Sequence, residues 1–106
     1  MPEDLPASPT PAMRPPHPGA ILRDDVLPAL GMSVKDAAAE LGISRQTLHA
    51  ILREDAPVTA EMAVRLGKWC GNGPTLWHAL QRDRDLWEAR QRMAEAIERI
   101  PTRAAA

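Results

Sequence analysis

Apolar residues recur every three or four positions between residues 18 and 100, which is the spacing of one face of an α-helix. Short breaks containing glycine, proline, serine or threonine divide this pattern into segments. Alanine is abundant whereas phenylalanine and tyrosine are absent, and this composition favours helices over strands. The sequence therefore predicts an all-α fold of five helices, over residues 18–27, 34–41, 45–53, 60–70 and 75–100.

The residues at the breaks indicate where each helix begins and ends. Ser33, Ser44 and Thr59 stand just before apolar segments, and their hydroxyls can cap the first free N–H groups of a helix. Gly42 can end the second helix with a positive φ. Pro28 lies inside the first apolar stripe and removes a helical hydrogen bond, so we expect that helix to kink or end near residue 27. Its stripe consists of Ile21, Leu22, Val26 and Leu30.

The segment 34–53 has the pattern of a helix-turn-helix. Two such helices cross closely through a short turn that often contains glycine, and Ala38 and Gly42 supply the small residue and the turn. Apolar residues at compatible positions can pin both helices to a core: Ala37, Leu41, Ile43, Leu48 and Ile51. An ordinary helical hairpin would meet only some of these demands, so we interpret the segment as a DNA-binding unit.

In this interpretation the helix 45–53 is the recognition helix, and its first residues face base edges in the major groove. Arginine can make two hydrogen bonds to guanine and glutamine two to adenine, which suits Arg45 and Gln46. Serine and threonine hydroxyls at a helix N-terminus suit phosphate oxygens. The predicted DNA-binding residues are Lys35, Ser44, Arg45, Gln46, Thr47, His49 and Arg53, with Ala50 facing a thymine methyl group.

The charge pattern lowers the affinity for DNA that we expect of a single chain. The chain carries a net charge of −1 and therefore has no overall positive field. Glu54 and Asp55 follow the recognition helix directly, and we expect this loop to lie near the DNA backbone, where carboxylates repel phosphates. A monomer would bind weakly, so the sequence favours a dimer on a palindromic operator.

The predicted fifth helix is longer than a domain of this size can cover. Trp77 and Leu80 are expected to pack on the core, whereas Trp87, Met93 and Ile97 would face water in a monomer. Exposed apolar residues at helical spacing indicate a partner surface. We predict a homodimer interface there, with a protein partner as the alternative occupant.

Composition sets the remaining limits. Seven of the eleven prolines lie in residues 1–18, so residues 1–16 are predicted to be a disordered arm, either without a role or binding a partner. Residues 17–100 form the domain and 101–106 a flexible tail. The single cysteine, Cys70, excludes an internal disulfide and a cysteine-bound metal, and fits the cytoplasm. No apolar run is long enough to cross a membrane.

Several of these segments together resemble one family. The motifs are residues 17–23 (HPGAILR), 33–48 with the turn GIS and the start RQTL, 58–66 (VTAEMAVRL), and 77–81 (WHALQ) with 85–87 (DLW). They are similar to the HigA-type antitoxins of the lambda-repressor-like (XRE) helix-turn-helix class. The resemblance implies a dimeric antitoxin that neutralises a HigB-type, RelE-like mRNA endonuclease and represses its own operon. The family commonly has Asn-Gly and basic residues where this chain has Glu54, Asp55, Ala56 and Pro57.

Catalysis finds no support in the sequence. The three histidines lack the spacing of metal ligands, and there is no phosphate-binding glycine loop and no nucleophile motif. We therefore predict a non-enzyme without cofactors. Two alternatives to the antitoxin stay open: a stand-alone XRE-family regulator without a toxin partner, and a protein-interaction module that has lost DNA binding.

Overall fold

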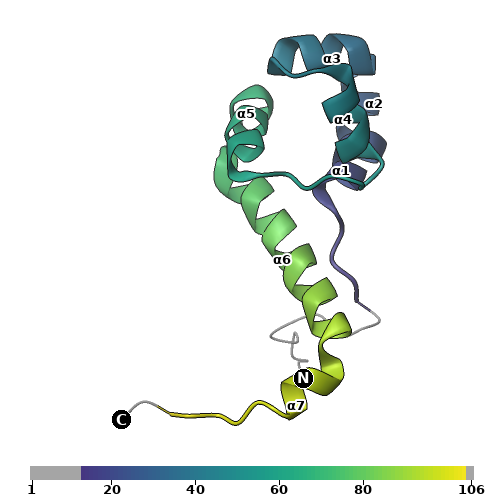
Figure 1. Cartoon of the computed structure of the whole chain (residues 1–106). Helices are drawn as coiled ribbons and strands as arrows, with labels where there is room; N and C mark the ends of the chain where they lie inside the picture. The colour runs from purple at the N-terminus through teal and green to yellow at the C-terminus, as the bar shows by residue number, and fades with distance from the viewer. Residues whose placement is uncertain (1–12, 105–106) are drawn as a thin grey trace, which may run out of the picture.

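The computed structural model describes residues 13–104, and within that range every regular element is a helix (Figure 1). The predicted all-α fold is confirmed. Eight predicted boundaries are matched by helix ends within one residue, including both ends of the two helices of the helix-turn-helix. The elements are α1 (Pro18–Ile21), η1 (Leu22–Val26), α2 (Leu27–Leu30), α3 (Val34–Leu41), α4 (Arg45–Leu52), α5 (Ala60–Cys70), α6 (Pro74–Arg92) and α7 (Ala94–Glu98).

The first helix runs past Pro28, because α1, η1 and α2 follow one another without a break. The segment η1 is a π-helical turn. Proline has no N–H for the carbonyl four residues earlier and needs room beside it, and the wider π turn provides that room. The extra residue in this turn rotates the following apolar stripe. Leu27 is buried as a result, whereas Leu30, which we expected in the stripe, is 53% exposed.

The predicted caps are confirmed where the sequence placed them. The side chains of Ser33, Ser44 and Thr59 each accept a hydrogen bond from the backbone N–H three residues later. Gly42 ends α3 in the left-handed region, with φ 74°. A fourth cap was not predicted: Nδ1 of His17 accepts from the N–H of Gly19 at 2.9 Å and begins α1. The helix boundaries of this chain are thus set by local side chains.

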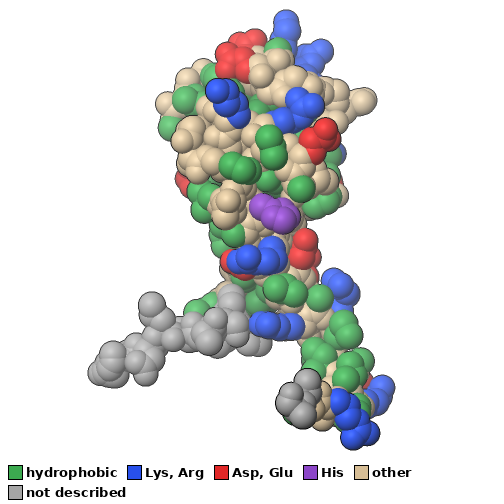
Figure 2. All heavy atoms as spheres, turned by 90° about the vertical axis from the view of Figure 1, so that its left-hand side faces the viewer, with side chains coloured by type: hydrophobic (Ala, Val, Ile, Leu, Met, Phe, Trp, Pro, Cys, Tyr) green, Lys and Arg blue, Asp and Glu red, His purple; other side chains and the backbone are tan. Residues whose placement is uncertain are grey.

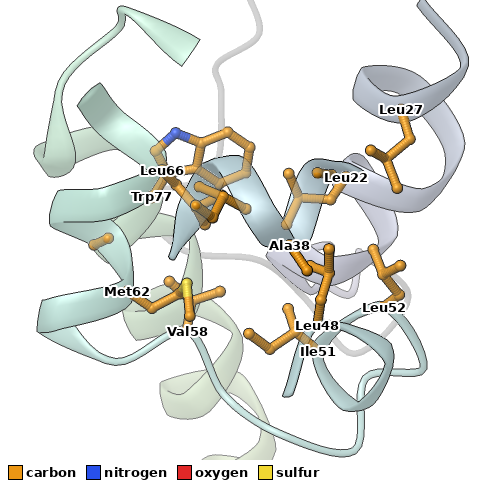
Figure 3. Packing of buried hydrophobic residues seen from close by; sticks show 13 residues of the cluster. Leu22, Leu27, Ala38, Leu48, Ile51, Leu52, Val58, Met62, Leu66 and Trp77 are labelled. Atoms are coloured by element: carbon orange, nitrogen blue, oxygen red, sulfur yellow. The ribbon is translucent and has the colours of Figure 1, made fainter. Parts of the chain in front are cut away.

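The buried core joins the first helix to α3, α4, α5 and the first half of α6 (Figure 3). Trp77, which is 2% exposed, brings α6 into this core as predicted. The buried hydrophobic residues are Leu22, Leu27, Ala37, Ala38, Leu41, Leu48, Ile51, Leu52, Val58, Met62, Ala63, Leu66 and Trp77. The core therefore holds the two helices of the helix-turn-helix from behind.

Glycine permits the closest approach between α1 and α4. A Cβ atom added to Gly19 would lie 1.8 Å from the carbonyl oxygen of Ile51, far inside contact distance. The α1 backbone therefore rests directly on the last turn of α4. No other residue type fits at position 19 without moving α4, which fixes the recognition helix against the N-terminal helix.

The second half of α6 and α7 extend away from the core. We call residues 13–84 the head and residues 85–104 the stem; the stem runs toward the bottom of Figure 1. No described residue of the stem is buried. The single helix predicted to residue 100 is corrected: α6 ends at Arg92, Met93 leaves the helical region with φ −101°, and α7 ends at Glu98. Without core contacts, nothing holds the long helix straight to its end.

Candidate nucleic-acid interface

The N-terminal end of α4 is built around Ser44 and Thr47. The Ser44 hydroxyl accepts from the Thr47 N–H at 3.0 Å and donates to the Thr47 hydroxyl at 2.8 Å. Both side chains are exposed. This arrangement places two hydroxyl groups at the positive end of the α4 dipole, where an anion is favoured.

Arg45, Gln46 and His49 lie on the exposed face of α4, as the sequence predicted. Within residues 13–104, no ion pair or side-chain hydrogen bond holds any of the three. Leu48 and Ile51 on the opposite face are 2% exposed and lie in the core. One side of α4 is thus packed into the core, and the other side presents hydrogen-bond donors that have no partner within the described residues.

The other candidate residues are placed less simply. Lys35 is exposed near the start of α3, which packs on α4. Arg53 is exposed but paired: its Nε lies 3.0 Å from a carboxylate oxygen of Asp55. Ala50 is half-buried rather than outward, because its carbonyl accepts from the N–H groups of Asp55 and Ala56 where the chain turns back. Arg53 therefore carries a partly neutralised charge.

The two acidic residues after α4 are also engaged within the chain, contrary to their expected role as free repulsive charges. Asp55 pairs with Arg53. The Glu54 carboxylate turns toward the body of the head, where Oε2 lies 3.2 Å from Arg23 and Oε1 lies 3.7 Å from Arg84. The reason is backbone geometry, since Glu54 has φ 65° and this directs its side chain back toward η1 and α6.

Two arginines from other elements bind the carboxyl ends of α3 and α4, the two helices of the helix-turn-helix. Arg23 of η1 donates to the Leu52 carbonyl at 2.9 Å, at the end of α4. Arg65 of α5 donates to the Leu41 carbonyl at 2.8 Å, at the end of α3. A cation is favoured at the negative end of a helix. The sequence did not predict either contact, because a helical pattern does not show which carbonyl a long side chain reaches.

A buried polar cluster lies behind α4. Arg84 is 7% exposed and His17 6% exposed. Arg84 donates to Glu88 at 2.8 Å and to the Pro15 carbonyl at 3.1 Å. The hydrogen bond from Arg84 keeps the pKa of Glu88 below its ordinary value. Burial lowers the pKa of His17, and the nearby Arg84 adds to this, against the opposing effect of Glu54, Glu88 and Asp85. His17 is therefore neutral at pH 7.

A second surface, away from the exposed face of α4, is apolar. A groove of about 510 Å³ lies between the first helix, the end of α5 and the start of α6. Leu30 and Leu76 at this groove are 53% and 47% exposed, and Cys70, which is also exposed, lies in its lining. The lining residues are Ile21, Asp25, Val26, Ala29, Leu30, Trp69, Cys70, Asn72, Leu76, Trp77 and Leu80.

The stem also carries exposed apolar residues. Leu86, Met93 and Ile97 are 49%, 41% and 43% exposed, and hydrophobic side chains gather on the lower part of the molecule in Figure 2. Trp87, which we expected to face water, is half-buried. It follows the half-buried Leu80 by two helical turns and so lies on the same side of α6. Of the residues predicted for a partner surface, Met93 and Ile97 are therefore exposed and Trp87 is only partly exposed.

The described residues offer neither of two other kinds of site. No group of three or more histidine, cysteine, aspartate or glutamate side chains among residues 13–104 could hold a metal ion. None of the helices in the same range is long and apolar enough to pass through a bilayer.

Known proteins are similar to this chain in sequence and in fold. A helix-turn-helix family model matches residues 22–72. The antitoxin HigA-1 of Vibrio cholerae is 32% identical over 82 residues, which cover 77% of this chain and 77% of that protein. The chain belongs to the HigA-type family of helix-turn-helix antitoxins. The predicted resemblance is therefore confirmed, and with it the expectation that the chain is not an enzyme.

Two solved structures of this HigA family agree with the whole fold. The antitoxin HigA of Pseudomonas aeruginosa, solved with the higBA promoter, is 34% identical, has a TM-score of 0.80, and matches 87% of this chain and 100% of its own. An addiction module antidote protein of the HigA family from Coxiella burnetii is 35% identical with a TM-score of 0.79, over 87% and 100% of the two chains. The similarity thus includes the long α6 as well as the helix-turn-helix.

Proposed function

We propose that this HigA-type chain is an antitoxin that binds operator DNA through α4, represses its own operon and neutralises a HigB-like mRNA endonuclease toxin. One observation carries the DNA-binding part. The exposed donors of Arg45 and Gln46 are uncommitted at the start of a helix that the core holds rigidly. The relative from P. aeruginosa, which has the same fold over its full length, was solved with promoter DNA. A repressor of this kind acts in the cytoplasm.

Each candidate residue has a role that its chemistry supports. Arg45 reads guanine and Gln46 reads adenine in the major groove, and His49 lies one turn further along the same face. Ser44, Thr47 and Lys35 bind phosphates and set the register of the helix on the duplex. Arg53 contributes less than a free arginine would, because Asp55 already pairs with it.

Arg45→Ala tests the DNA-reading role. We expect it to weaken binding to the specific operator by about 1–3 kcal/mol, with a smaller loss on a scrambled duplex. Mobility shifts with both duplexes measure this. Arg82→Ala is the matched control, because Arg82 is exposed on the part of α6 that belongs to the head and its removal changes the net charge equally. Equal losses on both duplexes would show that Arg45 contacts only phosphate.

We also propose that the chain acts as a homodimer through the stem, with Trp87, Met93 and Ile97 at the interface. The net charge of −1 makes a single head a weak electrostatic anchor. A two-fold dimer can place two recognition helices about 34–36 Å apart, on successive major grooves. The exposed Met93 and Ile97 lose their contact with water in such a pair.

The apolar groove of the head is the surface on the second copy that we propose to receive the stem. Met93 and Ile97 cannot fold back into the groove of their own chain, because the groove ends at Leu80 of α6 and the helix carries Met93 about 20 Å further along its axis. In a two-fold pair the stem of each chain can reach the groove of the other, and both apolar surfaces are then covered reciprocally.

Ile97→Glu tests the dimer, with Val64→Glu as control, since Val64 is exposed on α5 of the head. Light scattering should report a dimer for the control and a monomer for Ile97→Glu, and Trp87→Glu should behave like Ile97→Glu while remaining helical by circular dichroism. Alkylation of Cys70 in the groove should be slow in the dimer and faster in the Ile97→Glu variant. A dimer with an unprotected Cys70 would place the interface outside the groove.

Neutralisation is tested in cells with the toxin-like reading frame beside this one. Expression of that frame alone should stop growth, and co-expression of this chain should restore it, with the two proteins purifying as a complex. If the chain binds its operator but does not protect the cells, it is a stand-alone regulator. The third alternative is an interaction module without DNA binding, and it rested on repulsion of phosphates by Glu54 and Asp55. Both carboxylates are paired within the chain, which argues against that repulsion.

A further inference from the structure

The turn that ends α4 has a glutamate, Glu54, at the position where the backbone is left-handed. The N–H of Asp55 donates to the Ala50 carbonyl and the N–H of Glu54 to the Ile51 carbonyl, both at 2.9 Å. These two bonds form a Schellman motif, whose left-handed residue is usually glycine. Here that residue is Glu54, with φ 65°. A residue with a side chain pays about 1–2 kcal/mol of conformational free energy in the left-handed region. Glycine would avoid this cost but would not supply the Glu54 carboxylate.

The Glu54 carboxylate lies between two guanidinium groups from different elements. Arg23 lies 3.2 Å from Oε2, and the same Arg23 nitrogen donates to the Leu52 carbonyl at the end of α4. Arg84 of α6 lies 3.7 Å from Oε1. A continuous chain of charged contacts therefore runs from the last turn of the recognition helix, through Glu54, to α6.

Arg84 is the central member of this chain of contacts. Its side chain is 8% exposed, and each of its three nitrogens faces a different acceptor: Glu88, the Pro15 carbonyl and Glu54. A planar guanidinium can satisfy three acceptors at once, whereas a lysine ammonium cannot reproduce this geometry. Arg84 thus contacts three parts of the chain at once: α6 itself, the segment before α1, and the turn after α4.

We propose that Arg84 is a positioning residue that sets the orientation of the recognition helix through Glu54, and so couples the stem-bearing helix α6 to operator binding. The inference rests on the proposed DNA-binding function. It assigns to Glu54 the opposite effect from the one expected of a carboxylate near phosphates. Removing a repulsive charge would strengthen operator binding, whereas removing a positioning contact weakens it.

Glu54→Gly separates these two possibilities, because glycine suits the left-handed backbone and removes only the side chain. We expect Glu54→Gly and Arg84→Met each to weaken binding to the operator by about five- to tenfold, with CD showing fully folded protein at the assay temperature. The double variant should lose little more than either single variant, since both break the same contact. Arg84→Lys should not restore binding.

Two control variants carry the same changes in charge. Arg82→Met removes an arginine of α6 that is exposed and pairs only with the adjacent Asp83, and it should bind as the unchanged chain does. Asp55→Asn removes the neighbouring carboxylate and should bind slightly more tightly. If Glu54→Gly binds as tightly as the unchanged chain or more tightly, or if the two single effects add fully, the coupling is absent.

Hydrogen exchange gives a second readout that needs no operator. In Arg84→Met, the amides of residues 50–56 should exchange faster while those of the capped start of α4 keep their protection. Unchanged exchange at residues 50–56 would overturn the positioning role. If the unchanged chain itself fails to bind its operator, the proposed function fails, and the exchange result still decides whether Arg84 positions α4.

Discussion

The head and the stem of this HigA-type chain share the helix α6, yet they are stabilised in different ways. The first half of α6 contributes Trp77, Gln81 and Arg84 to the interior, and Gln81 accepts from the Val58 N–H at 2.8 Å. Beyond Arg84, no described residue is buried. The head therefore contains its own stabilising contacts, whereas the stem leaves its apolar residues for another surface to cover.

The comparison shows why sequence periodicity alone misjudges such a helix. Apolar spacing continues through both halves, so the pattern predicts one uniform element to residue 100. Only the head supplies a core for the pattern to pack against. Beyond Arg84 the helix has no buried residue and it breaks at Met93, so the same apolar spacing no longer marks a side that faces the core.

The largest expected effect lies at the closest contact in the head. Gly19→Ala places a Cβ 1.8 Å from the Ile51 carbonyl oxygen, so α1 and α4 must separate, and we expect a loss of about 3–5 kcal/mol in unfolding free energy. Urea denaturation followed by circular dichroism measures it. Gly31→Ala is the control, since its Cβ meets nothing within 4 Å and costs only about 1 kcal/mol through its positive φ.

The next prediction compares the two halves of the long helix directly. Trp77→Ala should cost about 3–5 kcal/mol of unfolding free energy, because the indole is 2% exposed. Ile97→Ala, at 43% exposure, should change the unfolding free energy of a dilute monomer by less than about 0.5 kcal/mol. At higher concentration, its effect should appear as weaker dimerisation in sedimentation. A large loss in the dilute monomer would show that the stem belongs to the head.

A smaller effect concerns the histidine cap of α1. The lowered pKa of His17 means that the unfolded chain binds a proton more readily than the folded chain. Stability is therefore present above the unfolded pKa, about 6.5, and is lost as the pH falls below it. Protonation of Nδ1 also removes the cap on Gly19.

Thermal unfolding between pH 8 and pH 5 measures this loss, which we expect to be roughly a few degrees in Tm. His17→Asn keeps a capping oxygen but cannot titrate in this range, so its profile should be flatter. His78→Asn, at an exposed position of α6, should retain the original slope. Identical profiles for all three proteins would assign the acid sensitivity to other groups.

The smallest expected effect is electrostatic. Asp55→Asn releases Arg53 from its ion pair, which gives the recognition helix one more free positive charge. We expect operator affinity to rise by about twofold and the salt dependence to steepen by about one counterion. Binding measured across a salt series tests this, and an unchanged slope would mean that Arg53 does not reach a phosphate.

The parts of the fold that the sequence predicts well are those that depend on neighbours along the chain. Ser33, Gly42 and Ser44 define α3, the turn and the start of α4, because a cap or a positive φ acts within three residues. The exposure of Arg45 and Gln46 follows from the same local helix, once the apolar side of that helix is known.

The parts that were missed depend on distant contacts or on small changes of helical register. The π turn at η1 adds a residue that shifts Leu27 inward and Leu30 outward. Arg84 meets Pro15, which lies 69 positions earlier in the chain. A pattern of charges along α6 cannot distinguish Arg84 from Arg82, although one is buried and the other is exposed.

The contact between Arg84 and Pro15 also has a consequence for the order in which the protein matures. Synthesis adds about 5–20 residues each second from the N-terminus, so the helix-turn-helix leaves the ribosome before α6 does. The segment before α1 and the turn after α4 must therefore wait for Arg84 to emerge. In the proposed arrangement, α4 can form early, but its final orientation is set only once Arg84 has left the ribosome.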